Sequence, residues 1–206
     1  GLPYAVSQGF SPHMLIAFGA ALPVGVGGTH EIADVRLTHY VTADKALSAL
    51  QDASVADLMV KDCRYIEPKA AAASVAFPVS TYRALLSCTP AVLPLPDEIH
   101  VVHKKKEKVL HPAEFLVGKF ELTGAVATFK LEAKPTGSLR PDLLLREAVD
   151  AYNHAAAGED ISGVTWVENA VEPEAMIAKK AERGLDLPCC DDDALRILNI
   201  MRIAQE

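Results

Sequence analysis

Hydrophobic and polar positions predict two strands near the start of the chain. The segment 14–24 is rich in residues that favour extended structure, and turn signals at 7–9 and 25–28 flank it, so we expect a long strand with a bend at Gly19. In the segment 31–39, apolar residues alternate with polar ones, which is the period of a half-buried strand. The glycine-rich link between the two segments favours an antiparallel hairpin.

The pattern becomes helical after Thr42. Apolar residues at positions 43, 46, 47 and 50 form the stripe of a short helix, with Thr42 as its N-cap. The segment 55–67 returns to a strand pattern. The order strand, strand, helix, strand is the later part of a ferredoxin-like β-α-β-β-α-β unit. Its first strand and helix would lie ahead of Gly1, so we expect this unit to be incomplete.

A run of alanines at 70–74 marks the expected boundary between two units. Beyond it, extended patterns at 75–87, 99–109 and 115–133 predict strands, interrupted by prolines between positions 90 and 96. The segment 140–155 predicts an amphipathic helix with a proline suited to its first turn. Its apolar stripe is Leu144, Leu145, Ala148, Val149 and Tyr152.

These elements predict an α+β fold made of two ferredoxin-like α/β units with antiparallel sheets, the first lacking its N-terminal strand and helix. The units are expected over residues 1–70 and 75–155, followed by a helical C-terminal tail over 156–206. In that tail the sequence predicts helices at 173–183 and 191–204. The second begins with three aspartates, which suit the positive end of a helix dipole.

Composition narrows the function classes. With 206 residues, half of them apolar, the chain is long enough to bury a core. A formal net charge of -7 disfavours a surface that is basic throughout, as a non-specific nucleic-acid binder tends to have. No segment approaches the roughly 18 apolar residues of a membrane span, and the start of the chain has no secretory signal pattern. We therefore expect a globular cytoplasmic protein.

The cysteines do not form a recognisable metal motif. Cys63, Cys88 and the neighbouring pair Cys189 and Cys190 lack the C-x-x-C spacing typical of zinc and iron–sulfur sites. The glycines at 25, 27 and 28 match neither common phosphate-loop motif, so we interpret them as a turn that needs positive φ. The sequence therefore predicts no metal site and no cofactor.

The segment SQGFSPH, residues 7–13, is the strongest candidate for binding or chemistry. His13 beside this turn is a weak candidate for a catalytic general acid or base. No orienting carboxylate lies nearby in the sequence, and the G-x-S-x-G nucleophile motif is absent. Contact with a substrate or partner is the preferred interpretation, through Ser7, Gln8, Gly9, Phe10 and His13.

The segment HVVHKKKEKVLH, residues 100–111, combines three histidines with four lysines. The simplest interpretation is a solvated edge strand whose lysines discourage pairing with another chain. The alternative is a patch that binds the phosphate backbone of a nucleic acid, with contacts from Lys104, Lys105, Lys106 and Lys108. Metal binding by the histidines is disfavoured, because no acidic partner stands at ligand spacing.

Three stretches of the sequence together resemble a known bacterial family. They are SQGFSPHMLIAFGAALPVGVGG at 7–28 with Glu31 and the strand DVRLT behind it, PKAAAAS at 68–74, and GSLRPDLLLREAV at 137–149. In these stretches the chain is similar to the radical-SAM-linked protein family, a domain of unknown function encoded beside a radical SAM protein or fused to one. The resemblance covers residues 1–150. Family members usually have a strand and a helix ahead of residues 1–3, and an aromatic residue where this chain has Ile32.

The resemblance implies an accessory role. The chain lacks the C-x-x-x-C-x-x-C cluster motif, so any radical chemistry would belong to a radical SAM partner. Family members are often encoded near ribonuclease and ribosomal-protein genes. We therefore expect a non-catalytic accessory or substrate-presenting domain that acts with a radical SAM protein on RNA or a ribosome-related substrate. Two alternatives stay open: a small-molecule or RNA-processing enzyme that uses His13 as general acid or base, and a purely structural protein-interaction domain.

Overall fold

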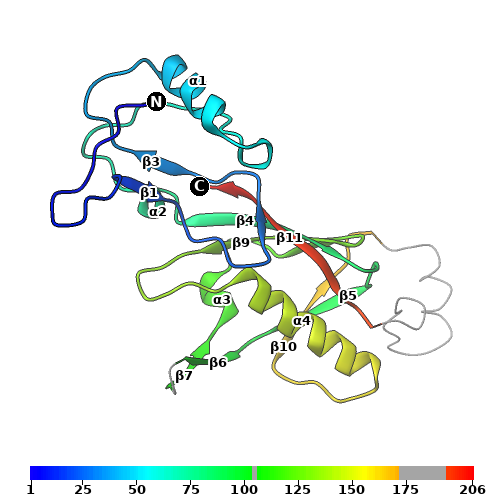
Figure 1. The fold of residues 1–206 in the computed structure, drawn as a ribbon. Helices are drawn as coiled ribbons and strands as arrows, with labels where there is room; N and C mark the ends of the chain where they lie inside the picture. The colour runs from blue at the N-terminus through cyan, green and yellow to red at the C-terminus, as the bar shows by residue number, and fades with distance from the viewer. Residues whose placement is uncertain (104–105, 172–193) are drawn as a thin grey trace. The chain divides into compact units, whose positions relative to one another are not determined.

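The chain forms two compact units in a computed structural model, which describes residues 1–103, 106–171 and 194–206 (Figure 1). Unit 1 comprises Gly1–Ala20 and Ile32–Ala76, and unit 2 comprises Ala21–Glu31 and Phe77–Glu206. The chain therefore passes from one unit to the other three times along its length.

Unit 1 is built on a small antiparallel sheet. Its elements are β1 (Ile16–Phe18), β3 (Ala33–Val35), α1 (Ala43–Ala53), the 3-10 turn η1 (Ala56–Leu58) and α2 (Ala73–Ala76). β1 pairs with β3, and three backbone hydrogen bonds tie the preceding chain to both strands. The Ala5 N–H donates to the Arg36 carbonyl at 2.7 Å, the Arg36 N–H to the Leu15 carbonyl at 2.9 Å, and the Leu15 N–H to the Ala5 carbonyl at 2.8 Å.

Side chains bonded to backbone groups connect the rest of unit 1. The Tyr65 hydroxyl donates to the Val41 carbonyl at 2.5 Å and accepts from the Val41 N–H at 3.1 Å. The Asp34 carboxylate accepts from the Ala73 N–H at 2.8 Å, at the start of α2. These contacts hold long irregular segments in place where few apolar side chains are buried.

Unit 2 contains a five-stranded sheet. Its elements are β2 (Gly27–Gly28), β4 (Val79–Leu86), β5 (Val92–Pro96), β6 (Ile99–His103), β7 (Lys106–Leu110), α3 (Pro112–Phe115), β8 (Glu121–Thr123), β9 (Val126–Glu132), α4 (Pro141–Ala156), β10 (Val164–Glu168) and β11 (Ile197–Gln205). The strand order is β2-β11-β4-β9-β8, and every pair is antiparallel except β2 with β11. Two further antiparallel pairs are β10 with β5 and β6 with β7.

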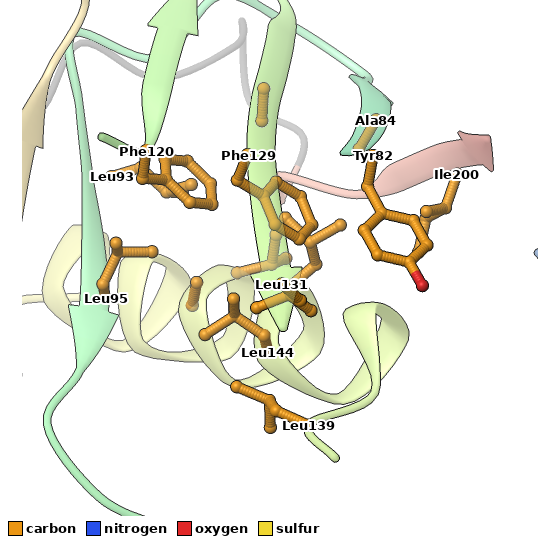
Figure 2. Packing of buried hydrophobic residues seen from close by; sticks show 14 of the residues in the cluster. Tyr82, Ala84, Leu93, Leu95, Phe120, Phe129, Leu131, Leu139, Leu144 and Ile200 are labelled. Carbon is orange, nitrogen blue, oxygen red and sulfur yellow. The ribbon is translucent and has the colours of Figure 1, made fainter. Parts of the chain in front are cut away.

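The core of unit 2 lies between this sheet and α4. Every second residue of β9 is buried, as expected for a strand with one face covered. Phe129 stacks between Phe120, 5.0 Å away between ring centroids, and Tyr82, 5.7 Å away. Figure 2 shows these rings and Ile200 projecting from the sheet, and Leu144 projecting from α4 among them. Leu144 is completely buried, so α4 covers this face of the sheet.

The segment Ala21–Glu31, which we call the strap, belongs to unit 2 although unit 1 precedes and follows it. Gly27 and Gly28 pair with Met201 and Arg202 of β11. A side chain on Gly27 would collide with the end of the Met201 side chain, which would have to move to make room for it. Within the strap, β2 is thus a short edge strand that pairs with β11.

The coarse fold class is confirmed: the protein is a mixed α/β structure with mostly antiparallel sheets and few helices. The ferredoxin-like arrangement of each half is not confirmed. The predicted helix at 140–155 is confirmed as α4, with Pro141 in its first turn and all five residues of the predicted stripe buried. The helix after Thr42 is confirmed as α1, although the Thr42 side chain makes no capping hydrogen bond in the described structure.

Several strand predictions need correction. Of the predicted strand 14–24, only Ile16–Phe18 forms a regular strand, with Met14 in an isolated bridge to Val6, because the chain turns after Gly19 and continues into the strap. The segment 55–67 is not a strand: it contains η1, and the Asp62 carboxylate bonds the next backbone N–H at 2.8 Å, which is typical of a local turn. In the segment 115–133, β8 and β9 form a hairpin instead of one continuous strand.

The prediction of a helical C-terminal tail is wrong for the described residues. The regular elements that the structure shows there after α4 are strands, β10 and β11. β10 pairs with β5, and β11 occupies 197–205, where a helix was expected. β11 is a strand because both of its edges are paired, to β2 and to β4. The predicted helix at 173–183, the three aspartates at 191–193 and the cysteine pair at 189–190 lie outside the described residues.

Candidate functional site

The predicted contact residues in SQGFSPH form one loop of unit 1, which we call the Ser7–His13 loop. Its two ends are joined twice: the Ser7 N–H donates to the His13 carbonyl at 2.7 Å, and the His13 N–H donates to the Ser7 hydroxyl at 2.9 Å. Val6 and Met14 form a bridge directly behind these bonds. Gly9 has φ +143°, a conformation that side chains disfavour. The loop is therefore a closed turn with fixed ends.

Phe10 stands at the outer end of this loop. Its exposed fraction is 108%, the value of a side chain that touches no other part of the described structure. Gln8, Gly9 and His13 are also exposed, whereas Ser7 is half-buried. The structure therefore brings all five predicted contact residues together on one solvent-facing turn, with the most apolar of them most exposed.

The apolar surface continues from the loop onto the strands behind it. Val6 and Met14 are bridge partners, and Ile16 is opposite Val35, so the side chains at 6, 14 and 16 share one face of the small sheet. The large apolar residues on this face are between 39% and 67% exposed. They are Tyr4, Val6, Met14, Ile16 and Phe18. Contiguous apolar surface of this kind marks contact sites more often than catalytic ones.

The His13 ring lies in solvent. Within the described part of the chain it makes no hydrogen bond or ion pair, and its only close polar contacts are those of its backbone. An imidazole acts as a general base most effectively when a carboxylate or carbonyl orients it. The described geometry of His13 suits surface contact better than acid–base catalysis.

The predicted phosphate-binding lysines are only partly described. Lys104, Lys105 and the side chain of Lys106 lie outside the described residues. Lys108 is exposed on β7, and its ammonium group donates to the Thr136 carbonyl at 3.3 Å. Acidic residues lie on the same hairpin: the Glu107 carboxylate is 3.0 Å from the His100 ring. The described part of this hairpin therefore carries charges of both signs.

Unit 2 contains one buried ion pair that sequence reasoning missed. The Arg202 side chain on β11 is fully buried and bonds Glu31 of the strap, with Nε donating to Oε1 at 2.9 Å and Nη2 donating to Oε2. Burial by itself acts to lower the pKa of Arg202. The hydrogen bond and charge of Glu31 outweigh burial and hold the pKa above its ordinary value, with a contribution from Tyr82. The pair is structural, because it fixes the strap to β11.

An acidic cavity of about 460 Å³ lies beside α4 in unit 2. Its polar lining includes Glu98, Glu147, Asp150 and His154. His154 is already bound to Glu159 at 2.8 Å. No group of three or more His, Cys, Asp or Glu side chains close enough to hold a metal ion occurs among the residues that the structure describes. Within the same residues, no helix has the length and hydropathy needed to cross a membrane.

Comparison with protein families gives one match. Residues 1–135 match the family model DUF2344, described as an uncharacterized protein conserved in bacteria. The chain belongs to this family. Searches of curated proteins and of solved structures found no match. The DUF2344 match contains the Ser7–His13 loop, the strap and the sheet as far as β9, but it does not reach α4, β10 or β11.

One surface feature of this DUF2344 chain was not predicted from sequence, namely the exposed apolar face behind the loop. Residues 14–18, Met-Leu-Ile-Ala-Phe, form an uninterrupted apolar run. Such a run is ordinarily interpreted as a buried strand, so sequence alone points the wrong way. Only the pairing of β1 with β3 and the exposure of the side chains in the structure show that this face meets solvent.

Proposed function

We propose that this DUF2344 chain is a non-catalytic accessory domain that binds a protein partner through the Ser7–His13 loop and the apolar face behind it. The observation that carries the proposal is Phe10, an aromatic side chain fully exposed on a turn whose ends are fixed by two hydrogen bonds. Aromatic side chains presented on rigid turns are frequent energetic hot spots of interfaces, since little conformational entropy is lost when they bind.

The partner that we propose is a radical SAM protein. This choice rests on the sequence resemblance described above and on the absence of a cluster-binding cysteine motif in the chain itself. In such a pair the radical SAM protein carries the chemistry, and this chain supplies a docking surface or presents the substrate. Ser7, Gln8, Gly9 and His13 surround Phe10 and supply polar contacts at the rim of the interface.

Affinity capture tests the partner proposal. The tagged protein should recover a radical SAM protein from a lysate of its host, and Phe10→Ala should weaken that binding by about 30-fold, the size of a hot spot of about 2 kcal/mol. Leu58→Ala is the matched control, because Leu58 is another strongly exposed apolar residue of unit 1, 76% exposed on η1. Equal recovery with Phe10→Ala, or no radical SAM protein in the eluate, would reject the proposal.

The substrate class that we propose is RNA or a ribosome-related molecule, from the resemblance and from the four lysines at 104–106 and 108 of the sequence. Mobility shift of tRNA and rRNA fragments over a salt series tests it. Replacing Lys104, Lys105, Lys106 and Lys108 by Gln should reduce the salt dependence of binding, because each lysine–phosphate contact releases counter-ions and so adds to the slope of log K against log salt. Absence of binding at low salt removes RNA from the proposal and leaves partner binding to be judged by the capture experiment.

The variant His13→Ala distinguishes the catalytic alternative from the accessory role. In the accessory role this change removes a rim contact and weakens partner binding only slightly. If His13 were a general acid or base, the same change would abolish turnover by the reconstituted pair while binding remained intact. Turnover assayed with saturating partner protein distinguishes the two outcomes.

A further inference from the structure

A second cavity, of about 260 Å³, opens on unit 2 and is separate from the Ser7–His13 loop. Its lining includes Thr81, Val117, Lys119, Glu121, Thr128 and Lys130. Thr81, Thr128 and Lys130 alternate along β4 and β9 with the buried residues Tyr82 and Phe129 that face α4. The side chains of the cavity therefore point to the opposite face of the sheet.

Thr81 is the unusual member of this lining. It is only 8% exposed, and its hydroxyl oxygen is buried without a hydrogen-bond partner among the described residues. A hydroxyl both donates and accepts, so both capacities are unused here. Buried polar groups without partners are rare in folded proteins and call for an explanation, such as a ligand that supplies the missing bond.

The strand register shows which residues lie beside Thr81. On β4, Thr81 lies opposite Lys130 of β9 on one side and Ala204 of β11 on the other. The Lys130 ammonium nevertheless reaches Glu206, just beyond β11, and bonds its two carboxylate oxygens at 2.9 and 3.1 Å. The Lys130 side chain must therefore extend across β4 close to Thr81. A carboxylate, that of Glu206, is therefore already bound to the ammonium group of the lysine opposite Thr81.

The lining carries two lysines and one glutamate, so it favours an anion once Glu206 leaves Lys130. Lys119 is exposed and makes no ion pair with any described residue, while Glu121 is the one acidic residue in the lining. Val117 offers an apolar wall. A small organic acid would place its apolar body against this wall and its carboxylate near the two lysines.

We propose that this cavity is a binding site for a small organic carboxylate. The ligand replaces the Glu206 carboxylate on Lys130 and accepts a hydrogen bond from the Thr81 hydroxyl, with Lys119 closing the site from the rim. Glu206 is then an internal competitor, which occupies Lys130 when the ligand is absent.

Titration of the full chain with benzoate, followed by backbone amide NMR, tests the proposal. Benzoate should shift the resonances of Thr81, Lys119 and Lys130 saturably, whereas the neutral isostere benzamide should not. Lys130→Met should weaken benzoate binding by about tenfold or more, the size of a charged hydrogen bond. Glu206→Gln should strengthen it, because the competitor is removed.

Thr81→Val separates the ligand role from a structural one. Valine has nearly the same shape but no hydroxyl, so the variant should melt at a higher temperature and yet bind benzoate several-fold more weakly. Unchanged benzoate affinity in Thr81→Val overturns the role of the hydroxyl. Absence of saturable shifts in both the native chain and Glu206→Gln overturns the site, and equal binding of inorganic phosphate or benzamide overturns its assignment to carboxylates.

Discussion

The two units of this chain are held together in different ways. Every residue of the hydrophobic core cluster belongs to unit 2, and three aromatic rings, Tyr82, Phe129 and Phe120, stack within it. In unit 1, every residue of which is described, the only buried apolar side chains are the alanines Ala46 and Ala73. Its larger apolar side chains are mostly exposed, and its segments are connected by hydrogen bonds to backbone groups.

This difference relates stability to function. Burial of apolar area is the dominant favourable term in folding, so unit 2 has the means to be stable and unit 1 has little. Regions with few buried apolar contacts open locally at low free energy, and binding surfaces are often drawn from them. We infer that unit 1 retains its apolar residues for a partner, whereas unit 2 has already buried its own.

The largest expected effect is in the core of unit 2. Leu144→Ala on α4 removes a fully buried side chain and should lower the free energy of unfolding by about 2–5 kcal/mol. Leu47→Ala on α1 is the matched change in unit 1, where the leucine is only half-buried, and should cost much less. Urea unfolding measures both. Equal losses would mean that unit 1 is as well packed as unit 2.

A smaller loss is expected at Asn169, a buried polar side chain of unit 2. The Asn169 amide nitrogen donates to the carbonyls of Pro90 and Gly124 at 2.7 and 2.8 Å, and its oxygen accepts from two backbone N–H groups. Asn169→Ala leaves these buried groups without partners and should cost about 2–3 kcal/mol. Asn169→Asp keeps the acceptor and loses the donors, so thermal unfolding should show it nearly as unstable. Full stability of the aspartate variant would contradict this account.

The next smaller loss of stability is expected at the ion pair between Glu31 of the strap and Arg202. Glu31→Gln leaves the buried Arg202 charge without its counter-ion, but Glu31 is 44% exposed, so the cost should fall below the roughly 3–5 kcal/mol of a fully buried pair. The clearer result is local: hydrogen exchange of the amide groups at 26–29 should speed up more than that of β9. Uniform acceleration across unit 2 would instead indicate global destabilisation.

The smallest effect is predicted in unit 1. Tyr65→Phe removes the hydroxyl that bonds both backbone groups of Val41 but keeps the ring stacked on Tyr40, 5.2 Å away. The expected cost is about 0.5–1.5 kcal/mol. It should be visible as faster hydrogen exchange at Val41 with the unfolding midpoint of unit 2 unchanged. A shift of that midpoint would show that the two units unfold together.

Sequence patterns predicted the elements whose burial is regular and local. The helix α4 was found because Pro141 and a continuous apolar stripe indicate the same boundaries. β4 was found within the predicted strand 75–87 for a similar reason. The Ser7–His13 loop was predicted as a turn from its glycine and proline residues, and the structure shows that Gln8 and His13 face solvent.

Patterns failed where the deciding partner lies far away in the sequence. β11 has apolar residues at 197, 200, 201 and 204, a spacing that also fits a helix, and it is a strand because β4 pairs with it more than a hundred residues away. Arg202 interrupts the apolar pattern of the buried strand face, because a charged residue normally indicates an exposed position. It is buried here because Glu31 neutralises its charge. The carboxylate site proposed near Thr81 was missed for the same reason, because it depends on the register of three strands.

The position of β11 also bears on how the protein is synthesised. This strand lies between β2 and β4 inside the sheet, yet it is synthesised more than a hundred residues after β4. Until it emerges from the ribosome, β4 has an open edge and the strap has no strand to pair with, so the nascent chain displays both to other proteins. Native assembly of the sheet must therefore wait until β11 has been synthesised. Before β11 has paired, chaperones would be most important in protecting the open edge of β4 from other proteins.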